Sequence, residues 1–158
     1  VDIHFLHIRS AHGAARPLLM THGWPGSVLE FMKVIEPLTH PQDHGGTIED
    51  AFHLVIPSLP GYGFSGKPTT NGWGLEKIAQ AWNLLMQRLG YERYYAQGGD
   101  WGAGVTSEIA KQNLGNCRGI HINMPTAWPT KAARENPTKR DDAAFKGART
   151  YRDWDSGN

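Results

Sequence analysis

A single aspartate lies among glycines in the stretch Gly98-Gly99-Asp100-Trp101-Gly102. A carboxylate can attack a saturated carbon without a base and form an ester whose carbonyl belongs to the protein, and water then cleaves that ester. Gly98 and Gly102 suit a nucleophile elbow, a sharp turn in which small neighbours let a strand and a helix pass closely. The alternative interpretation is a glycine-rich turn in which Asp100 is the N-cap of the next helix.

Two more loops of unusual composition precede this turn. One is His22-Gly23-Trp24-Pro25-Gly26-Ser27, which follows a short apolar run. The other is Pro57-Ser58-Leu59-Pro60-Gly61-Tyr62-Gly63-Phe64-Ser65, whose prolines and glycines forbid regular structure. Ligands of open parallel sheets bind at the carboxyl ends of strands. We therefore expect the loops at Trp24 and Asp100 to lie at that edge of one sheet.

Apolar periodicity predicts the elements that must position these loops. Helical spacing runs from Val28 to Leu38, where Pro37 disturbs the helix, and Ser27 with Glu30 forms an expected capping box. Residues 40–50 form an expected surface loop. Further helices are expected at 74–90, 103–114 and 143–154, and strands at 1–9, 17–21, 52–56, 93–97 and 119–124. Because strands and helices alternate, the fold class is α/β, with a mostly parallel sheet and helices on both faces.

Composition excludes several classes of protein. Among 158 residues, 39% are hydrophobic and 20% charged, which is typical of a globular domain, and the net charge of +1 argues against nucleic-acid binding. The one cysteine, Cys117, makes no internal disulfide and fits a reducing compartment. No stretch approaches the roughly 20 apolar residues of a membrane span. Composition leaves open whether the protein forms a homo-oligomer.

The N-terminus lacks an initiator methionine and a signal peptide and begins within an expected strand. Our interpretation is a fragment truncated at both ends. We expect a cytoplasmic protein. Whether an N-terminal membrane anchor precedes Val1 is left open.

Taken together, the elbow at Asp100 and the two upstream loops resemble the epoxide hydrolases of the α/β-hydrolase fold. The opening Asp2-Ile3-His4-Phe5-Leu6-His7-Ile8-Arg9-Ser10 and the form His22-Gly23-Trp24-Pro25-Gly26-Ser27 are similar to the microsomal-type branch. The likeness covers about Val1 to Met124. It implies an incomplete α/β-hydrolase core, with residues 1–124 as its N-terminal half and residues 125–158 as the start of the lid.

The resemblance also implies roles for three residues. Asp100 is the expected nucleophile, and the backbone N–H groups of Trp24 and Trp101 are the expected oxyanion hole, which holds the carboxylate and later the charge on the ester. Gly23 and Pro25 would fix the path of the first loop. The alternative for Trp24 is a buried core aromatic residue.

Other catalytic groups are expected outside this sequence. In the family, two lid tyrosines donate hydrogen bonds to the epoxide oxygen, and a histidine held by a carboxylate activates water. We expect all of them beyond Asn158, and Tyr151 does not match the first lid tyrosine. By the same resemblance, His22 is a structural residue, and His121 is interpreted as a packed or surface residue. The remaining histidines show no metal-ligand spacing, so we expect no metal and no cofactor. They are His4, His7, His12, His40, His44 and His53.

The leading hypothesis is therefore an epoxide hydrolase, a detoxification enzyme that opens small-molecule epoxides to vicinal diols with water through an Asp100 ester. One alternative is a haloalkane or haloacid dehalogenase, which uses the same kind of nucleophile. Those enzymes often carry Asn or Glu where Trp24 stands, so epoxides are favoured. Another alternative is a non-catalytic fragment, with an unpaired sheet edge and no turnover.

Overall fold

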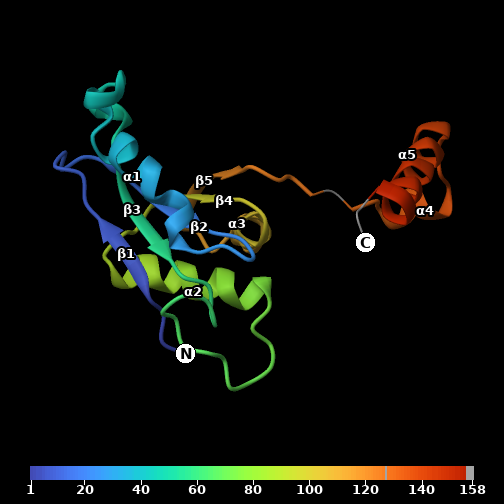
Figure 1. Cartoon of the computed structure of the whole chain (residues 1–158), viewed down its shortest axis with the longest axis horizontal. Helices are drawn as coiled ribbons and strands as arrows, with labels where there is room; N and C mark the ends of the chain where they lie inside the picture. Colours follow the sequence, from blue (N-terminus) through green and yellow to red (C-terminus); the bar gives the residue numbers. More distant parts are fainter. Residues whose placement is uncertain (127, 156–158) are drawn as a thin grey trace. The chain divides into compact units, whose positions relative to one another are not determined.

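The computed structural model describes residues 1–126 and 128–155, and the chain divides into two compact units, Val1–Pro125 and Thr126–Asn158 (Figure 1). The first unit holds a five-stranded sheet in the order β1-β3-β2-β4-β5. Strands β2 to β5 are parallel, and only β1 is antiparallel, to β3. The predicted mostly parallel sheet is therefore confirmed. Its strands are β1 (Phe5–Ile8), β2 (Arg16–Thr21), β3 (Phe52–Pro57), β4 (Tyr94–Gly98) and β5 (Cys117–Ile122).

Helices cover both faces of this sheet, as the alternation of strands and helices along the chain predicts. Leu18 and Met20 of β2 pack on one face with residues of α1 and of the preceding 3₁₀ turn, whereas Leu19 packs on the other with α2 and α3. Side chains of a strand alternate between faces, so one strand supplies both cores. Figure 1 shows α1 and α2 on opposite sides of the sheet. These helical elements are η1 (Val28–Phe31), α1 (Met32–Thr39), α2 (Leu75–Arg88) and α3 (Trp101–Gln112).

The edge strand β1 is shorter than the expected strand over residues 1–9. The carbonyl of Asp2 accepts the N–H of Gly66 at 2.8 Å, and the carbonyl of His4 accepts the N–H of Ser58, also at 2.8 Å. Residues before Phe5 therefore pair with the loop that follows β3. This pairing ties the N-terminal segment to that loop.

The capping box expected at Ser27 and Glu30 is wrong. The Ser27 hydroxyl accepts the N–H of Leu29 at 3.2 Å, and residues 28–31 wind as the 3₁₀ turn η1 before α1 begins. A reciprocal capping box occurs at Thr47 and Asp50 instead. It lies in the segment expected to be a loop, which contains two short 3₁₀ turns, η2 (Pro41–His44) and η3 (Ile48–Asp50).

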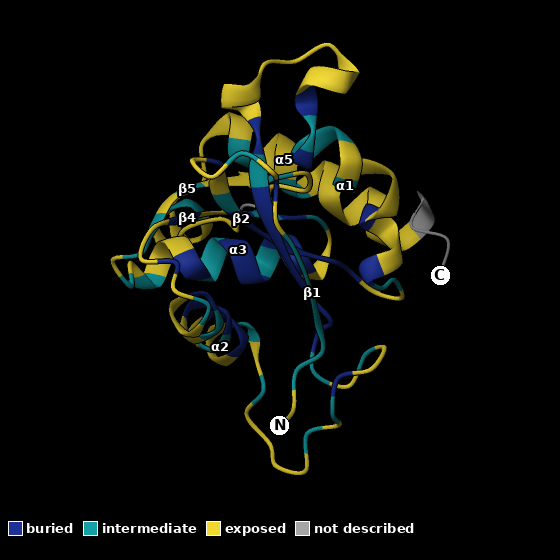
Figure 2. Cartoon of the chain, turned by 90° about the vertical axis from the view of Figure 1, so that its left-hand side faces the viewer, coloured by how far each residue is buried: buried dark blue, intermediate teal, exposed yellow. Residues whose placement is uncertain are grey.

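The larger core fixes the carboxyl end of β2 against α2. Trp82 is fully buried, and its indole N–H donates to the Thr21 hydroxyl at 3.1 Å. Tyr94 is also fully buried and donates to the Asn83 side-chain oxygen at 3.0 Å, while burial raises the pKa of the tyrosine. Figure 2 shows the buried residues concentrated in the strands and on the inner sides of α2 and α3. Thr21 is the last residue of β2, so α2 helps to position the loop that follows it.

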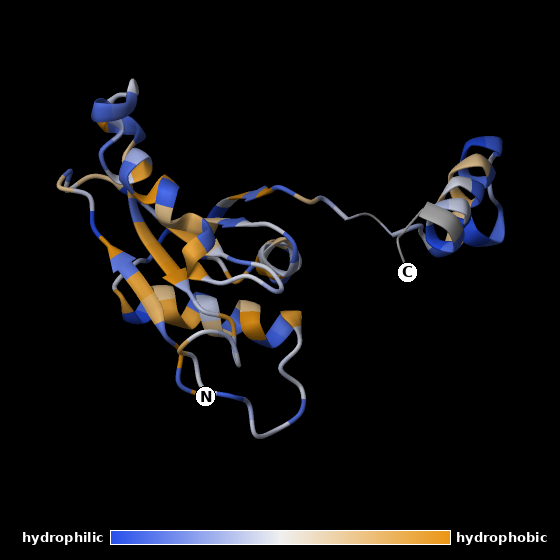
Figure 3. Ribbon diagram, in the orientation of Figure 1, coloured by the Kyte–Doolittle hydropathy of each residue, from blue (hydrophilic) through white to orange (hydrophobic). Residues whose placement is uncertain are grey.

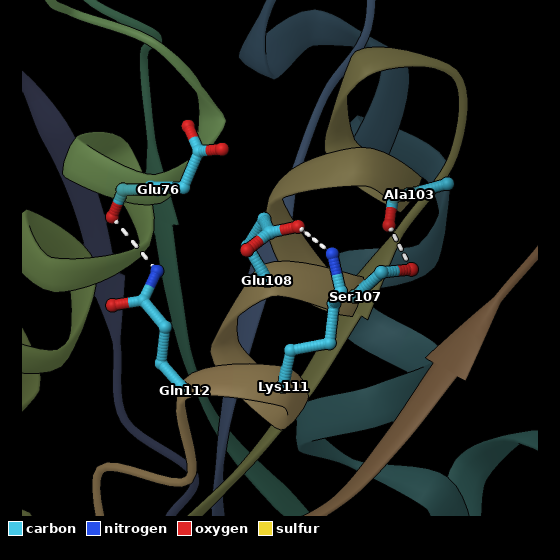
Figure 4. A network of polar contacts seen from close by, with 6 residues as sticks. All are labelled: Glu76, Ala103, Ser107, Glu108, Lys111 and Gln112. Atoms are coloured by element: carbon cyan, nitrogen blue, oxygen red, sulfur yellow. Dashed lines mark hydrogen bonds and ion pairs between the residues drawn. The ribbon is translucent and has the colours of Figure 1, made fainter.

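Helix α3 is held against α2 by close packing and by polar contacts. A methyl group added at Gly104 would lie 2.9 Å from Leu75 Cδ1, so the two helices approach closely there. At the other end the Gln112 amide donates to the carbonyl of Glu76 at 3.1 Å (Figure 4). The first turn of α3 therefore has a defined place beside the start of α2.

The second unit contains two helices and a π turn, α4 (Lys131–Glu135), α5 (Lys139–Thr150) and η4 (Tyr151–Asp155). The helix expected from residue 143 begins earlier, because Thr138 and Asp141 form a capping box that starts α5 at Lys139. Sequence reasoning did not predict α4. Figure 3 shows polar residues dominating these helices, whereas apolar residues concentrate in the strands of the first unit. Among the described residues, no helix is long and apolar enough to cross a bilayer.

Candidate active site

Asp100 lies at the corner where β4 ends and α3 begins. Its backbone has φ 52° and ψ −124°. Positive φ is uncommon for a residue with a side chain and costs of order 1–3 kcal/mol, which the surrounding structure must offset. The corner therefore presents its side chain at the strained apex expected of a nucleophile elbow.

Two glycines allow this corner to form. A methyl group at Gly98 would collide with the carbonyl of Gly102, and a methyl group at Gly102 would collide with the carbonyl of Thr21. In both cases the obstacle is backbone, which cannot rotate away. The close approach of β4, α3 and the end of β2 thus requires glycine at both positions.

Two main-chain N–H groups hold the Asp100 carboxylate. The N–H of Trp24 donates to Asp100 Oδ1 at 2.8 Å across 76 residues of sequence. Hydrogen bonds from the N–H of Trp24 and then from that of Trp101 lower the pKa of Asp100, against a small opposing effect of burial. Asp100 occupies the N-cap position of α3, but its side chain makes no capping bond of the usual kind and instead accepts the N–H of Trp24 from a distant loop, so the interpretation of Asp100 as an ordinary helix cap is wrong. The group is an exposed, ionised carboxylate held by two loops.

The side chains of both tryptophans point away from the core. Trp24 is 64% exposed and Trp101 is 52% exposed. The alternative of a buried core aromatic at Trp24 is therefore wrong. Because their backbones hold the carboxylate while their rings remain uncovered, both rings are available to contact a bound molecule.

Gly23 brings the first loop up to the carboxylate. A methyl group at this position would lie 2.5 Å from Asp100 Cβ and 2.7 Å from Asp100 Oδ1. Ordinary carbon contacts begin near 3.5 Å, so only glycine lets the loop approach this closely.

His22 is buried and has both ring nitrogens in use. Its Nε2 accepts the N–H of Leu59 at 3.0 Å, which leaves the proton on Nδ1 to donate to the carbonyl of Gly23 at 2.9 Å. A neutral imidazole has one donor and one acceptor, so both are satisfied. His22 therefore has no free nitrogen with which to accept a proton from water.

The same contacts orient the peptide that holds the carboxylate. The carbonyl and N–H of a trans peptide point in opposite directions. Because His22 binds the carbonyl of Gly23, the N–H of Trp24 is directed to the other side, where Asp100 lies. Sequence reasoning missed this role of Leu59 and of the Gly23 carbonyl, because backbone groups leave no signal in residue type.

The other residues considered from the sequence are His121 and Tyr151. His121 pairs with Gln97 in the β4–β5 ladder and lines a hollow of about 650 Å³ on the sheet face near α1. Tyr151 belongs to the second unit and is exposed. Within residues 1–126 and 128–155, no group of three or more His, Cys, Asp or Glu side chains is placed to hold a metal ion.

The chain matches the family model of the alpha/beta hydrolase fold over residues 16–149. It is 52% identical over 157 residues to a protein of Stigmatella aurantiaca named "Putative epoxide hydrolase", covering 99% of this chain and 36% of that protein. It is 43% identical over 128 residues to epoxide hydrolase 1 of Oryctolagus cuniculus, covering 78% of this chain and 28% of that protein.

Among solved structures, it superimposes on the juvenile hormone epoxide hydrolase of Bombyx mori with a TM-score of 0.68. That match has 42% identity and covers 77% of this chain and 32% of the silkworm chain. The chain thus spans about a third of the length of the relatives it matches.

Proposed function

The chain belongs to the α/β-hydrolase fold family and is similar to the epoxide hydrolases of its microsomal-type branch, and from this premise we propose that the full-length protein hydrolyses epoxides to vicinal diols. The single observation that carries the proposal is the strained, exposed Asp100 with its carboxylate held by the N–H groups of Trp24 and Trp101.

In the first step a carboxylate oxygen of Asp100 attacks a carbon of the epoxide ring. The bond between that carbon and the ring oxygen breaks, and the ring oxygen leaves as an alkoxide that takes a proton from an acid. The lowered pKa of Asp100 keeps the group ionised, so it needs no base for this step. The product is an alkyl ester of the protein.

In the second step water attacks the carbonyl carbon of that ester. Negative charge develops on the former carboxylate oxygen, where the N–H groups of Trp24 and Trp101 would stabilise it, a contribution typically worth about two to three powers of ten in rate for each donor. Collapse of this intermediate releases the diol and restores the carboxylate.

This second step needs a base that His22 does not supply, because its ring nitrogens bind Leu59 and Gly23. We place the base, its acidic partner and the acid for the alkoxide elsewhere in the full-length protein, as the resemblance implies. The 158-residue chain alone is then expected to form an ester without turning over.

The test is to incubate the full-length protein with an epoxide in heavy-oxygen water and analyse the peptide that contains Asp100 by mass spectrometry. After several turnovers the carboxylate should carry the label, because hydrolysis of the ester leaves one water oxygen on the protein. Diol formation without label at Asp100 would contradict the mechanism. Release of halide from a haloalkane, with no opening of epoxides, would favour the dehalogenase alternative.

A further inference from the structure

A cavity of about 320 Å³ lies between the loop after β3, the start of α2 and the first turns of α3. Its size equals the volume of about ten water molecules, at ~30 Å³ each. The residues used below line its walls, namely Leu59, Tyr62, Trp73, Ile78, Trp101 and Val105.

This cavity shares Trp101 with the corner that holds the Asp100 carboxylate. Trp101 lines the cavity and also directs its N–H to Asp100. Of the other lining residues, Leu59 donates its N–H to His22, and the ring of Tyr62 packs edge-on against that of His22 with centroids 5.5 Å apart. Trp101 therefore links the cavity to the corner at which a molecule would react.

The lining is suited to an apolar group that contains an aromatic ring. None of the described residues that line the cavity carries a charge. Tyr62, Trp73 and Trp101 present three aromatic side chains, and aromatic pairs gain additional stability from edge-to-face and offset contacts. Ligand pockets typically combine such an apolar lining with few polar groups.

The walls are also well supported. Val105 is fully buried and Ile78 is 9% exposed, so the floor belongs to the main core. The Trp73 ring is held from outside by the ammonium group of Lys77, 4.6 Å from its centroid. Lys77 is not among the lining residues, so its charge supports the wall without entering the cavity.

We propose that this cavity binds the apolar substituent of the epoxide, and that the preferred substrates carry one aryl group of about ten non-hydrogen atoms or fewer. Trp73 and Ile78 then determine specificity: Trp73 supplies an aromatic wall and Ile78 limits the depth. This inference rests on the proposed function, because it identifies the class of substrate that the same site accepts.

The kinetic test compares a phenyl-substituted epoxide with a methyl-substituted epoxide in the full-length protein. In Trp73→Ala, kcat/KM for the phenyl substrate should fall at least about tenfold, while the methyl substrate changes less than about twofold, because only the larger group reaches the wall. Ile78→Phe fills the cavity and should produce the same selective loss. Phe64→Ala is the control, since Phe64 is an 87% exposed aromatic residue of the same loop outside the lining. Equal losses for both substrates, or no loss, would overturn the proposal.

Thermal unfolding shows whether each variant is folded. If the larger side chain of Ile78→Phe prevents folding, the result with Trp73→Ala alone tests the proposal. A binding measurement separates this proposal from the hydrolase proposal. A phenyl-bearing vicinal diol should shift the indole N–H resonances of Trp73 and Trp101 in an NMR titration, and a methyl-bearing diol should not. If those shifts occur without label at Asp100, the pocket stands and the hydrolase proposal fails. If Asp100 is labelled while the phenyl diol shifts neither resonance, the pocket proposal fails alone.

Discussion

Substitution of Gly23 by alanine should push the loop at Trp24 away from Asp100 and so remove one carboxylate donor. The added methyl group would lie 2.7 Å from Asp100 Oδ1, which is about 0.8 Å inside the ~3.5 Å of an optimal carbon contact. The nearest atom is Asp100 Cβ, at 2.5 Å, which is fixed to the backbone, so the loop at Gly23 and the corner at Asp100 must move apart. A displacement of that size would lengthen the 2.8 Å bond to the N–H of Trp24 to roughly 3.6 Å, beyond a useful hydrogen bond.

The expected result is a large loss of rate with a moderate loss of stability. Loss of one such donor typically costs about 10²–10³ in kcat. The pKa of Asp100 should also rise toward its ordinary value, because the bond from Trp24 is the largest cause of its lowering. The free energy of unfolding should fall by about 1–3 kcal/mol, the usual cost of an added methyl group that forces a backbone shift.

The assay is epoxide turnover by the full-length protein, with the rate followed from pH 3 to pH 8 and unfolding followed by urea. Gly13→Ala is the matched control, because a methyl group there meets no atom within 4 Å. Wild-type turnover and an unchanged acid limb in Gly23→Ala would refute the role of the Trp24 N–H. An unfolded variant would instead show that the loop and the corner cannot move apart without loss of the fold.

Three further predictions concern the elbow, acid stability and the nucleophile. Gly102→Ala should fail to fold, or should melt far below the wild type in a thermal scan, because the methyl group meets a backbone carbonyl. The control is Gly147→Ala, which should melt like the wild type because the added methyl group meets no atom within 4 Å. Stability should decrease as the pH falls below about 6.5. Burial is the largest cause of the lowered pKa of His53. As the pH falls, His53 therefore takes up a proton in the unfolded chain before it does so in the folded chain. Protonation of Nδ1 in the folded chain would also break the hydrogen bond from the N–H of Ser10. Urea titrations at pH 7.5 and 5.5 should show this loss, and His53→Asn should reduce it; an unchanged pH dependence in that variant would contradict the assignment. Ester formation at Asp100 should keep more than half of its neutral-pH rate at pH 4, near the pKa of an ordinary aspartate, in a single-turnover assay, because the two N–H donors lower its pKa; a rate of half or less would refute this.

The order of strands and helices and the elbow itself could be predicted from the sequence because both depend on local spacing. Alternating and helical apolar periods predicted five strands and the helices of the first unit, and the glycines at positions 98 and 102 indicated a close crossing at Asp100. Each of these features is determined by residues within a few positions of one another. The early strand and the last helix were located correctly but with wrong ends, because pairing with a distant loop and a cap at Thr138 set those ends.

The contacts within the candidate site were decided only by the tertiary structure. The bond between the Trp24 N–H and Asp100 joins groups 76 residues apart, and the bond between Leu59 and His22 joins groups 37 apart. Periodicity measures only the neighbourhood of a residue, so it could not separate an exposed Trp24 from a buried one. The sequence by itself thus determined which residue stands at the corner. The tertiary structure decided which N–H groups reach Asp100 and which aromatic rings enclose the cavity, because both depend on how the sheet brings separate loops together. Backbone donors and cavity walls are properties of position in space and not of residue type.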